Sequence, residues 1–388
     1  MRQAWAVARL TLKEGLRART LPVLAVLFAL TLALTAAATG SAATPQERFR
    51  ALLSASGQGT HLLLLLAATT LGALSYPQEA RRKTLLHLFS KPLSRGAYLA
   101  GKWAGLAALL LLLGAACSAV ATAFIASTGS AAPSGARAIQ VPLGLLGAEA
   151  VPAGTRWRFA PSPGRAPSLL QVSLAVSPPP SLDAVLSQGG GGVTVTLPFN
   201  SSGDAESVLP PLQPGPDGGY AVVLPLSANR VLPGPEGVRL VALSPNYPGL
   251  LVQAMLGDWI QAVTLCALAL AVSLFVSAPV ALFTAATLTL MAHAHPLVKD
   301  LEGLIARQDR IEAAAPAAPS RHALVAREVG NLRYATPDLA ALELCPALAL
   351  AESRPWWDVS WTALACLPYA LAGLLLAWIG LSRAELGR

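Results

Sequence analysis

Long hydrophobic runs set the pattern of this chain, and their lengths are those of helices that cross a membrane. A spanning helix needs about 20 predominantly apolar residues with few or no charges. The regions that meet this description are residues 21–39, 60–76, 103–127, 249–297 and 359–381. These runs predict an α-helical integral membrane protein.

The fourth run is too long for a single crossing. At about 1.5 Å per residue, a continuous helix over residues 249–297 would extend roughly 70 Å, more than twice the thickness of the hydrocarbon layer. Ser277-Ala278-Pro279 is the expected turn, because proline disfavours helix in the residue before it and is tolerated at a helix start. We therefore expect six transmembrane helices: three within 21–127, two within 249–297, and the sixth, with a cytoplasmic tail, within 359–388.

Residues 1–20 predict an amphipathic helix rather than a span. Apolar and basic residues recur at helical spacing on adjoining strips, as in a helix that lies flat among lipid headgroups. The apolar strip is Trp5, Ala8, Leu12 and Leu16, and the basic strip is Arg9, Lys13 and Arg17. We expect Trp5 and the three basic residues to anchor this helix to the membrane. The alternatives are a merely basic N-terminus before a signal anchor, and a secretory signal cleaved near TAAATGSAA.

Composition and charge agree with a bilayer as the solvent. Of the 388 residues, 54% are hydrophobic and 12% are charged, against about 25% charged in soluble domains. The net charge of +8 fits nucleic-acid binding or a membrane protein oriented by basic loops, and the apolar runs favour the second. Residues 1–20, 77–102 and 382–388 hold 13 of the 28 lysines and arginines. The positive-inside rule therefore predicts a multi-pass protein of the cell membrane, with both termini cytoplasmic and no nucleic-acid partner.

Residues 128–248 differ sharply from the rest of the chain. They are rich in Pro, Gly and Ser and contain short alternating apolar runs bounded by turn residues, a pattern typical of strands. We expect an inserted extracytoplasmic domain resembling a β-sandwich. The candidate strands are 155–160, 169–176, 192–199, 219–226 and 238–243. The second extracytoplasmic segment, residues 298–358, is too long for a plain loop and predicts short helices.

Candidate chemistry within the spans is sparse. Asp258 is a carboxylate inside an apolar run, where ionisable groups are costly and often line an aqueous path or an interior contact. It is therefore a candidate for a translocation path, and the alternative is a place among headgroups beside Trp259. His293 and His295 are either two interfacial histidines or a proton or metal site.

Other catalytic and metal signatures are missing from the sequence. The four cysteines (Cys117, Cys266, Cys345 and Cys366) lack metal-site spacing, and GxSxG and HExxH motifs do not occur. The stretch Gly96–Trp103 departs from a Walker A loop, because Trp103 stands where a Ser or Thr hydroxyl is needed. The sequence thus predicts no catalytic residue, no metal and no cofactor, and a protein that is not an enzyme.

The basic segment 77–102, PQEARRKTLLHLFSKPLSRGAYLAGK, predicts a short cytoplasmic helix. Leu85, Leu88 and Phe89 fall on one side of it, ahead of Pro92 and a second basic helix that leads into the membrane. Exposed apolar residues on such a helix need covering by lipid or protein. A docking surface is the specific prediction.

This segment resembles the corresponding loop of ABC-2 type exporter permeases, particularly those without an ATPase domain of their own. Their pattern is E-x-x-x-x-T-L-x-x-L-x-S-x-P-x-S-R-x-x-Y-L-x-G-K, and this chain matches it from Glu79 to Lys102. The leader ARLTLKEGLRART is similar to the family's interfacial elbow helix, and VSAPVALF, YATPDLAAL, DVSW and SRAELG extend the resemblance to about two thirds of the chain. The β-rich insert departs from the shortest members.

The resemblance implies a permease that pairs with a second copy or a similar permease and binds two copies of a cytoplasmic ABC ATPase. ATP hydrolysis would then occur in the partner, and the loop would transmit movement to the spans. The residues expected to dock the ATPase are Glu79, Arg81, Arg82, Lys83, Leu88 and Phe89, while Arg95 and Lys102 are expected to anchor helix ends to headgroups. An alternative is a membrane scaffold or assembly factor whose β-domain binds partner proteins. Lipid, glycan, peptide and drug all remain open as cargo of an exporter.

Overall fold

The computed structural model forms two compact units. The helical unit comprises Met1–Ser130, Pro248–Ala349 and Pro355–Arg388, and the strand unit comprises Ala131–Tyr247 and Leu350–Arg354. Within them, the structure describes residues 2–17, 20–38, 45–81, 94–128, 139–143, 145–151, 154–160, 167–173, 181–188, 191–198, 204–209, 220–225, 238–244, 246–293, 339, 348 and 355–383.

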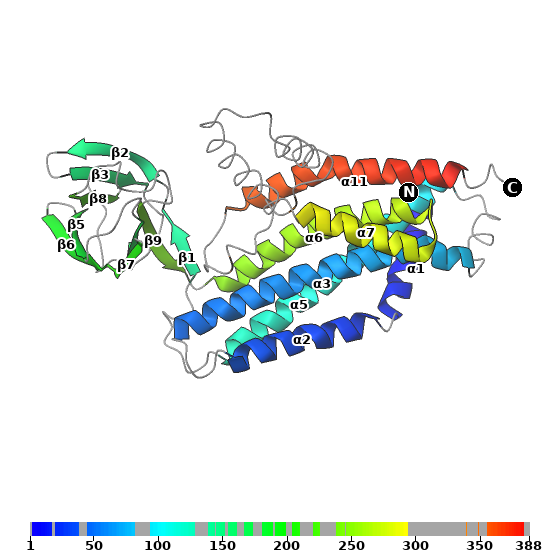
Figure 1. Ribbon diagram of the computed structural model, residues 1–388, viewed down its shortest axis with the longest axis horizontal. Coiled ribbons are helices and arrows are strands. Elements are labelled where there is room, and N and C mark those ends of the chain that lie inside the picture. Colours follow the sequence, from blue (N-terminus) through cyan, green and yellow to red (C-terminus); the bar gives the residue numbers. More distant parts are fainter. Residues whose placement is uncertain are drawn as a thin grey trace, which may run out of the picture. The chain divides into compact units, whose positions relative to one another are not determined.

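In its described residues the helical unit is a bundle in which α2, α3, α5, α6, α7 and α11 lie alongside one another and α1 crosses them near the end where α11 finishes (Figure 1). The helices are α1 (Arg2–Arg17), α2 (Thr20–Ala38), α3 (Pro45–Arg81), α5 (Arg95–Thr128), α6 (Tyr247–Ser273), α7 (Ala278–His293) and α11 (Trp357–Arg383).

Four helices of the described part are long and apolar enough to cross a membrane. They are Arg48–Arg81, Arg95–Ser127, Tyr247–Ser273 and Trp357–Arg383, while Val23–Ala38 and Ala278–His293 are shorter apolar helices. Large apolar side chains on α2 and α11 face outward, as expected of helices whose solvent is lipid. The structure therefore supports a helical membrane protein with four candidate spans, and six crossings stay a prediction.

The turn predicted in the long apolar run is present. The helix α6 ends at Ser273 and α7 begins at Ala278, with Pro279 in its first turn. The prediction for the second run was too short, because α3 begins at Pro45 and continues past Pro77 to Arg81. The segment 45–58, which lies ahead of the predicted span 60–76, is thus helical. Apolar runs do not predict this part of the helix, because it contains polar and charged residues.

Close contacts between small residues hold the bundle together. Ala73 of α3, Ala269 of α6, and Ala281 and Ala285 of α7 form one buried cluster.

Two tryptophans join α5 and α6 by donating hydrogen bonds to backbone carbonyls. Trp259 Nε1 lies 2.8 Å from the Ala107 oxygen, and Trp103 Nε1 lies 3.3 Å from the Val263 oxygen. Such bonds satisfy backbone and indole groups without water, as a membrane interior requires.

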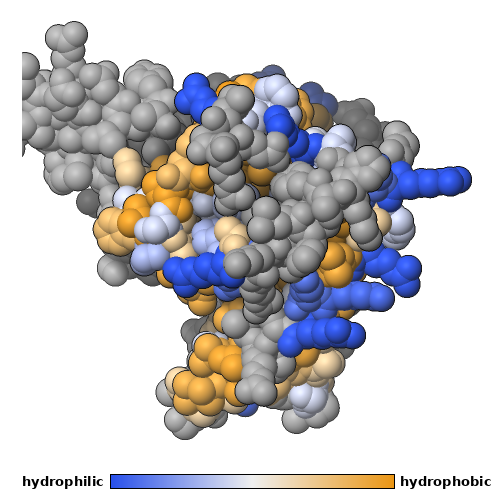
Figure 2. All heavy atoms as spheres, turned by 90° about the vertical axis from the view of Figure 1, so that its right-hand side faces the viewer, coloured by the Kyte–Doolittle hydropathy of each residue, from blue (hydrophilic) through white to orange (hydrophobic). Residues whose placement is uncertain are grey.

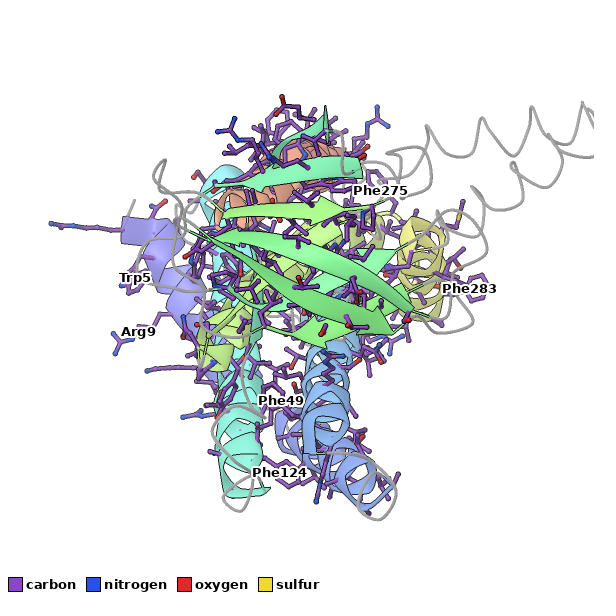
Figure 3. The ribbon with its side chains drawn as sticks, turned by 90° about the vertical axis from the view of Figure 1, so that its left-hand side faces the viewer. Trp5, Arg9, Phe49, Phe124, Phe275 and Phe283 are labelled. Atoms are coloured by element: carbon purple, nitrogen blue, oxygen red, sulfur yellow. The ribbon has the colours of Figure 1, made fainter. Side chains whose placement is uncertain are left out.

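The N-terminal helix α1 packs along α5 at two glycines. A Cβ atom placed on Gly101 would lie 2.4 Å from the Ala4 carbonyl oxygen, and one on Gly105 would lie 2.7 Å from the Ala8 carbonyl oxygen. Only a residue without a side chain allows this backbone approach. On the other side of α1, Trp5 and Arg9 project away from the bundle (Figure 3).

Replacing Gly101 by alanine should separate α1 from α5. The added methyl group overpacks the contact and should lower the free energy of unfolding by about 1–3 kcal/mol, despite the better helix propensity of alanine. The control is Gly96→Ala on the same helix, where nothing lies within 4 Å of the added Cβ atom. Thermal unfolding of the purified protein in detergent would compare them. Equal melting temperatures for the two variants would contradict the packing described here.

The strand unit contains two antiparallel sheets in its described residues. One sheet has the order β1-β9-β4-β7 and the other the order β2-β3-β8-β5-β6. The strands are β1 (Ile139–Pro142), β2 (Leu145–Val151), β3 (Gly154–Phe159), β4 (Pro167–Ser173), β5 (Ser181–Gln188), β6 (Gly191–Pro198), β7 (Asp204–Val208), β8 (Tyr220–Leu224) and β9 (Val238–Ser244). The first and last strands pair, with Ile139 opposite Ser244.

Both sheets contribute side chains to one buried apolar cluster, so they form two layers around a shared core. Leu170 and Leu240 come from the first sheet, and Phe159, Val222 and Leu224 come from the second. The burial alternates along β8, as expected of a strand with one face toward a core. The strand unit therefore has a core of its own.

The five strands expected from the sequence correspond to β3, β4, β6, β8 and β9, and four others were missed. Those four lack clean alternation or are short: β2 reads LLGAEAV, β5 reads SLDAVLSQ and β7 reads DAESV. Alanine and acidic residues have low strand propensity, so these segments become strands through their pairing with neighbouring strands in the sheet.

Candidate functional site

The ends of α3 and α5 that flank the basic loop are joined by a largely buried ion pair. The carboxylate of Glu79, near the end of α3, accepts hydrogen bonds from the Tyr98 hydroxyl and the Lys102 ammonium group of α5. Tyr98 is 4% exposed and Lys102 is 5% exposed. We call these three residues the Glu79 cluster.

Local sequence directs both partners toward Glu79. Ser94 caps α5: its hydroxyl accepts from the Ala97 amide at 3.3 Å, and its carbonyl accepts from the Tyr98 amide at 3.0 Å. Residues four apart on a helix share a face, so Tyr98 and Lys102 lie one above the other. The Y-L-x-G-K part of the pattern that resembles the family therefore places Tyr98 and Lys102 on the helix face that contacts Glu79.

Apolar contacts extend the Glu79 cluster to other helices. Tyr98 packs with Val7 of α1 and Leu381 of α11, and Tyr76 and Leu274 pack against this group. Because packed cores deform little, a displacement of the loop ends would therefore move α1, α5 and α11 together.

The structure places the predicted docking residues in different surroundings. Glu79 faces inward, to Tyr98 and Lys102, while Arg81 is exposed at the end of α3. Arg82, Lys83, Leu88 and Phe89 lie outside the described residues. Docking stays a prediction for all of them.

The predicted anchoring residues are mostly exposed. Trp5, Arg9, Lys13 and Arg17 are exposed on α1, and Arg95 is exposed at the start of α5. Lys102 differs, because its ammonium group is buried against Glu79. On the face of the helical unit that lies to the right in Figure 1, hydrophilic side chains gather beside hydrophobic ones (Figure 2).

Replacing Lys102 by methionine should destabilise the bundle strongly. It leaves the Glu79 carboxylate, whose side chain is 16% exposed, without the Lys102 counter-charge, and removing one partner of a buried ion pair costs up to about 3–5 kcal/mol. Adding Glu79→Gln should recover part of the loss, since the buried charge is then gone. Melting temperatures of the two single variants and the double variant in detergent would measure the coupling.

The control for this cycle is Arg95→Met, which removes an exposed charge from the same helix. Exposed positions usually change stability by no more than about 0.5 kcal/mol. Additive effects of Lys102→Met and Glu79→Gln would show that the two side chains do not act as a pair.

A second polar cluster lies inside the bundle. His61 of α3 and Asp258 of α6 are hydrogen bonded, with Nδ1 and Oδ1 2.9 Å apart, and their side chains are 8% and 1% exposed. The His61 and His293 rings meet edge to face with centroids 5.2 Å apart. His293 Nδ1 in turn lies 2.7 Å from the Thr289 carbonyl oxygen on α7.

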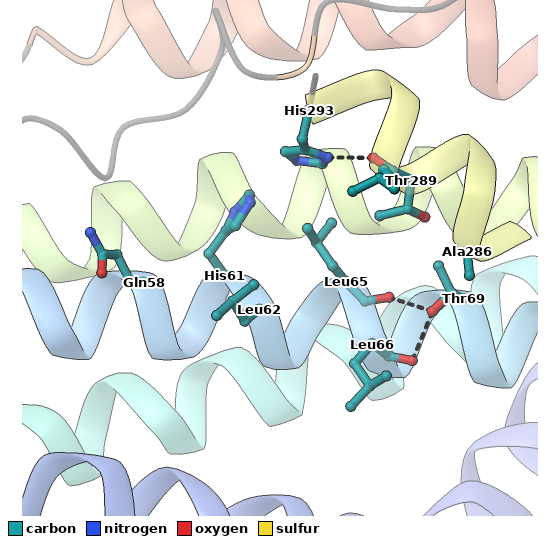
Figure 4. A pocket seen from close by; sticks show the side chains of 10 residues that line it. Gln58, His61, Leu62, Leu65, Leu66, Thr69, Ala286, Thr289 and His293 are labelled. Atoms are coloured by element: carbon teal, nitrogen blue, oxygen red, sulfur yellow. Dashed lines mark hydrogen bonds between the residues drawn. The ribbon is translucent and has the colours of Figure 1, made fainter. Parts of the chain in front are cut away.

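An open cavity of about 800 Å³ between α3 and α7, with the exposed Leu62, Leu66 and Leu290 at its rim, borders this cluster (Figure 4). Its wall is mainly apolar, with the two histidines and a few hydroxyl and amide groups as the polar part. The lining residues are Gln58, His61, Leu62, Leu65, Leu66, Thr69, Ala286, Thr289, Leu290 and His293. This volume is in the range of pockets that hold small molecules.

Sequence reasoning found two members of this cluster and missed one. Asp258 is buried within the bundle, and its part in a translocation path stays a prediction. His293 takes part, while His295 lies outside the described residues. His61 was missed although it is an ionisable residue inside the predicted span 60–76, the same signal that singled out Asp258.

The described residues contain no group of three His, Cys, Asp or Glu side chains placed to hold a metal ion. Three cysteines, Cys117, Cys266 and Cys366, are free and buried. Cys345 lies outside the described residues.

Comparisons with known proteins identify the N-terminal part of the chain. Residues 5–142 match the family described as ABC-2 family transporter protein. The chain is also 35% identical over 131 residues to "Probable ABC transporter permease protein NosY" of Stutzerimonas stutzeri, an alignment that covers 32% of this chain and 47% of that relative. These matches support an ABC-2 type permease and agree with the predicted resemblance over residues 5–142, while the resemblance of the later segments stays a prediction. Together with the apolar helices, they support a location in the membrane.

Proposed function

We propose that this ABC-2 type permease is the membrane subunit of an ATP-driven exporter and works with separate cytoplasmic ATPase subunits. The family implies an ATPase partner in general terms, and the matched residues 5–142 include the basic loop and the helices on either side of it. Two permease copies, or this chain and a similar one, would pair in the membrane and bind two ATPase copies.

The observation that carries this proposal is the Glu79 cluster. A loop that receives force from an ATPase needs stiff connections to the spans on both sides, or its movement is absorbed locally. The ion pair fixes the end of α3 to the start of α5, and Tyr98 extends the connection to α1 and α11. Closure of the ATPase subunits would therefore move several helices as one body.

Docking depends in this proposal on the apolar side of the loop helix. Leu88→Asp or Phe89→Asp should weaken co-purification of the ATPase at least about ten-fold, because a buried charge without a partner costs several kcal/mol. The measurement is the ATPase-to-permease ratio after affinity purification in detergent. Leu146→Asp, at an exposed leucine of the strand unit, is the control. Full retention of the ATPase by both loop variants would refute the docking assignment.

The proposed topology has six spans with both termini and the loop in the cytoplasm, and with the strand unit and residues 298–358 outside. The helices α2 and α7 would be the two shorter spans, with 19 and 16 residues. Short spans are accommodated by local thinning of the bilayer at modest cost. The helix α1 would lie at the inner surface with Trp5 and its basic residues among headgroups.

Thiol labelling of intact cells tests this topology. A cysteine introduced at Ser90 in the loop should stay unlabelled by an impermeant maleimide until the membrane is opened, whereas one at the exposed Ser181 in the strand unit should react at once. The buried Cys117, Cys266 and Cys366 supply little background, and Cys345 would be replaced by alanine. Labelling of the loop position from outside would invert the topology and end the coupling proposal.

The cavity beside Asp258 is the proposed part of the translocation path. It combines an apolar wall with a few polar groups, which is typical of pockets that bind molecules with both kinds of surface. The cargo class can be identified by adding lipids, glycans, peptides and drugs in turn to the reconstituted complex. The class that stimulates ATP hydrolysis is the cargo.

A membrane scaffold or assembly factor is the second candidate function, and the strand unit favours it. This unit has a core of its own and lies almost entirely beyond the family match, which ends at residue 142. A scaffold would retain a partner protein through the strand unit without any effect of ATP. An exporter would show ATP-dependent turnover.

A further inference from the structure

We propose that the cavity between α3 and α7 binds one acyl chain of a phospholipid, which enters from the side of the bundle and keeps its headgroup at the Gln58 end. The inference names a ligand class for the proposed translocation path, and it rests on the proposed function in the choice of leaflet. The proposed topology places the start of α3 outside the cell, so the lipid comes from the outer leaflet. Binding itself requires neither an ATPase nor ATP.

The rim of the cavity opens toward the hydrocarbon of the bilayer. Leu62 and Leu66 of α3 are 65% and 52% exposed, and Leu290 of α7 is 72% exposed. The helix α3 is one of the candidate membrane spans. Exposed leucines on a span contact acyl chains, which are as apolar as leucine itself. A lipid chain can therefore enter the cavity without passing through a polar layer.

The polar groups of the wall gather at one end of the cavity. Gln58 and His61 follow each other along α3, and His293 of α7 faces His61 with a centroid distance of 5.2 Å between the rings (Figure 4). Farther along α3 the wall continues with Leu65, and Ala286 lies on α7 at that end (Figure 4). This gradient fits a ligand with a polar head and an apolar tail.

The two threonines of the wall do not offer hydroxyl hydrogens to a ligand. Thr69 Oγ1 donates to the Leu65 carbonyl oxygen at 2.9 Å, and Thr289 Oγ1 donates to the Ala285 carbonyl oxygen at 2.9 Å. Hydroxyl groups that bond back to their own helix in this way are satisfied locally. The part of the wall beyond the histidines therefore suits a hydrocarbon chain better than a polar group, which would lose its hydrogen bonds there.

The length of the cavity matches one leaflet of a bilayer. At about 1.5 Å per residue, Gln58 and Thr69 lie roughly 16 Å apart along α3. Half of a hydrocarbon core of about 30 Å is nearly the same distance. Gln58 also comes just before the predicted span 60–76, at the level expected for headgroups. A lipid held there would extend its chain along the wall toward Thr69.

The side chains at the rim favour a lipid over a helix of a second copy. Contacts between membrane helices are enriched in small residues, which let backbones approach closely. Such a contact occurs inside the bundle, where a Cβ atom placed on Gly72 would lie 2.8 Å from the Ala269 Cβ atom. The rim instead carries Leu62, Leu66 and Leu290, which hold a neighbouring backbone at a distance.

Photocrosslinking of the full-length chain in nanodiscs, without an ATPase, tests the proposal. The nanodiscs would contain phosphatidylcholine and a small fraction of one of two photoreactive analogues, with a diazirine either at the end of one acyl chain or in the headgroup. Adducts would be mapped by mass spectrometry. We expect the chain-end probe to label Thr69 and Leu66 and the headgroup probe to label Gln58.

Filling the cavity should remove the chain-end adducts. Ala286→Trp places an indole ring on the wall, so the yield on Thr69 should fall about ten-fold or more, because no room is left for a chain. The matched control is Thr287→Trp, the next residue, which is also exposed but does not line the cavity. Adducts on Leu30 of α2, 51% exposed, report general lipid contact and should be equal in both variants. If Ala286→Trp fails to fold, Leu66→Trp at the rim replaces it with the same expectation for Thr69.

Three outcomes would overturn the proposal. Equal yields on Thr69 in the filled variant and in Thr287→Trp would leave only general contact with the bilayer. Labelling of Thr69 by the headgroup probe would refute the orientation. A disulfide between two copies of Leu290→Cys, formed on oxidation in a chain with Cys345→Ala, would give the cavity to a second copy.

The failure of the proposed function would look different. Saturable labelling of the cavity, with no stimulation of ATP hydrolysis by the same lipid in the reconstituted complex, would support the lipid site and exclude that lipid as cargo.

Discussion

The buried contact of Glu79 with Lys102 joins two helices that the basic loop separates along the chain. A carboxylate and an ammonium group in a low-dielectric interior are stable only together, so neither helix end moves without the other. Tyr98 completes this contact and at the same time packs against α1 and α11. The mechanical role proposed for the loop depends on this one interaction.

Helix α3 is the element that links the two polar clusters. Glu79 lies near its C-terminal end, and His61 lies five turns earlier on the same helix, where it bonds to Asp258 of α6. In a lipid environment each buried polar group must find its partner within the protein, so every such bond specifies a neighbour for α3. The clusters therefore do more than carry chemistry, because they determine which helices pack together.

The sequence predicted the apolar helices and the turn near Pro279, because bilayer thickness and proline geometry act on residues close together in the chain. It could not predict that Lys102 turns inward, since that depends on Glu79 being 23 residues away on a helix end. His61 could have been identified by its place in an apolar run, but its partner Asp258 is 197 residues away. The sequence also could not predict that α1 packs on α5, because Gly101 and Gly105 do not indicate which backbone lies against them.

The pairing of β1 with β9 has a consequence for the architecture of the chain. Since Ile139 lies opposite Ser244, the polypeptide enters and leaves the strand unit at neighbouring points, about 5 Å apart between Cα atoms in such a pair. An insertion with adjacent ends places little geometric demand on the host segment. More than a hundred residues can thus be accommodated between α5 and α6 as a module, much as a short hairpin would be, while the two helices keep the spacing that their own packing sets.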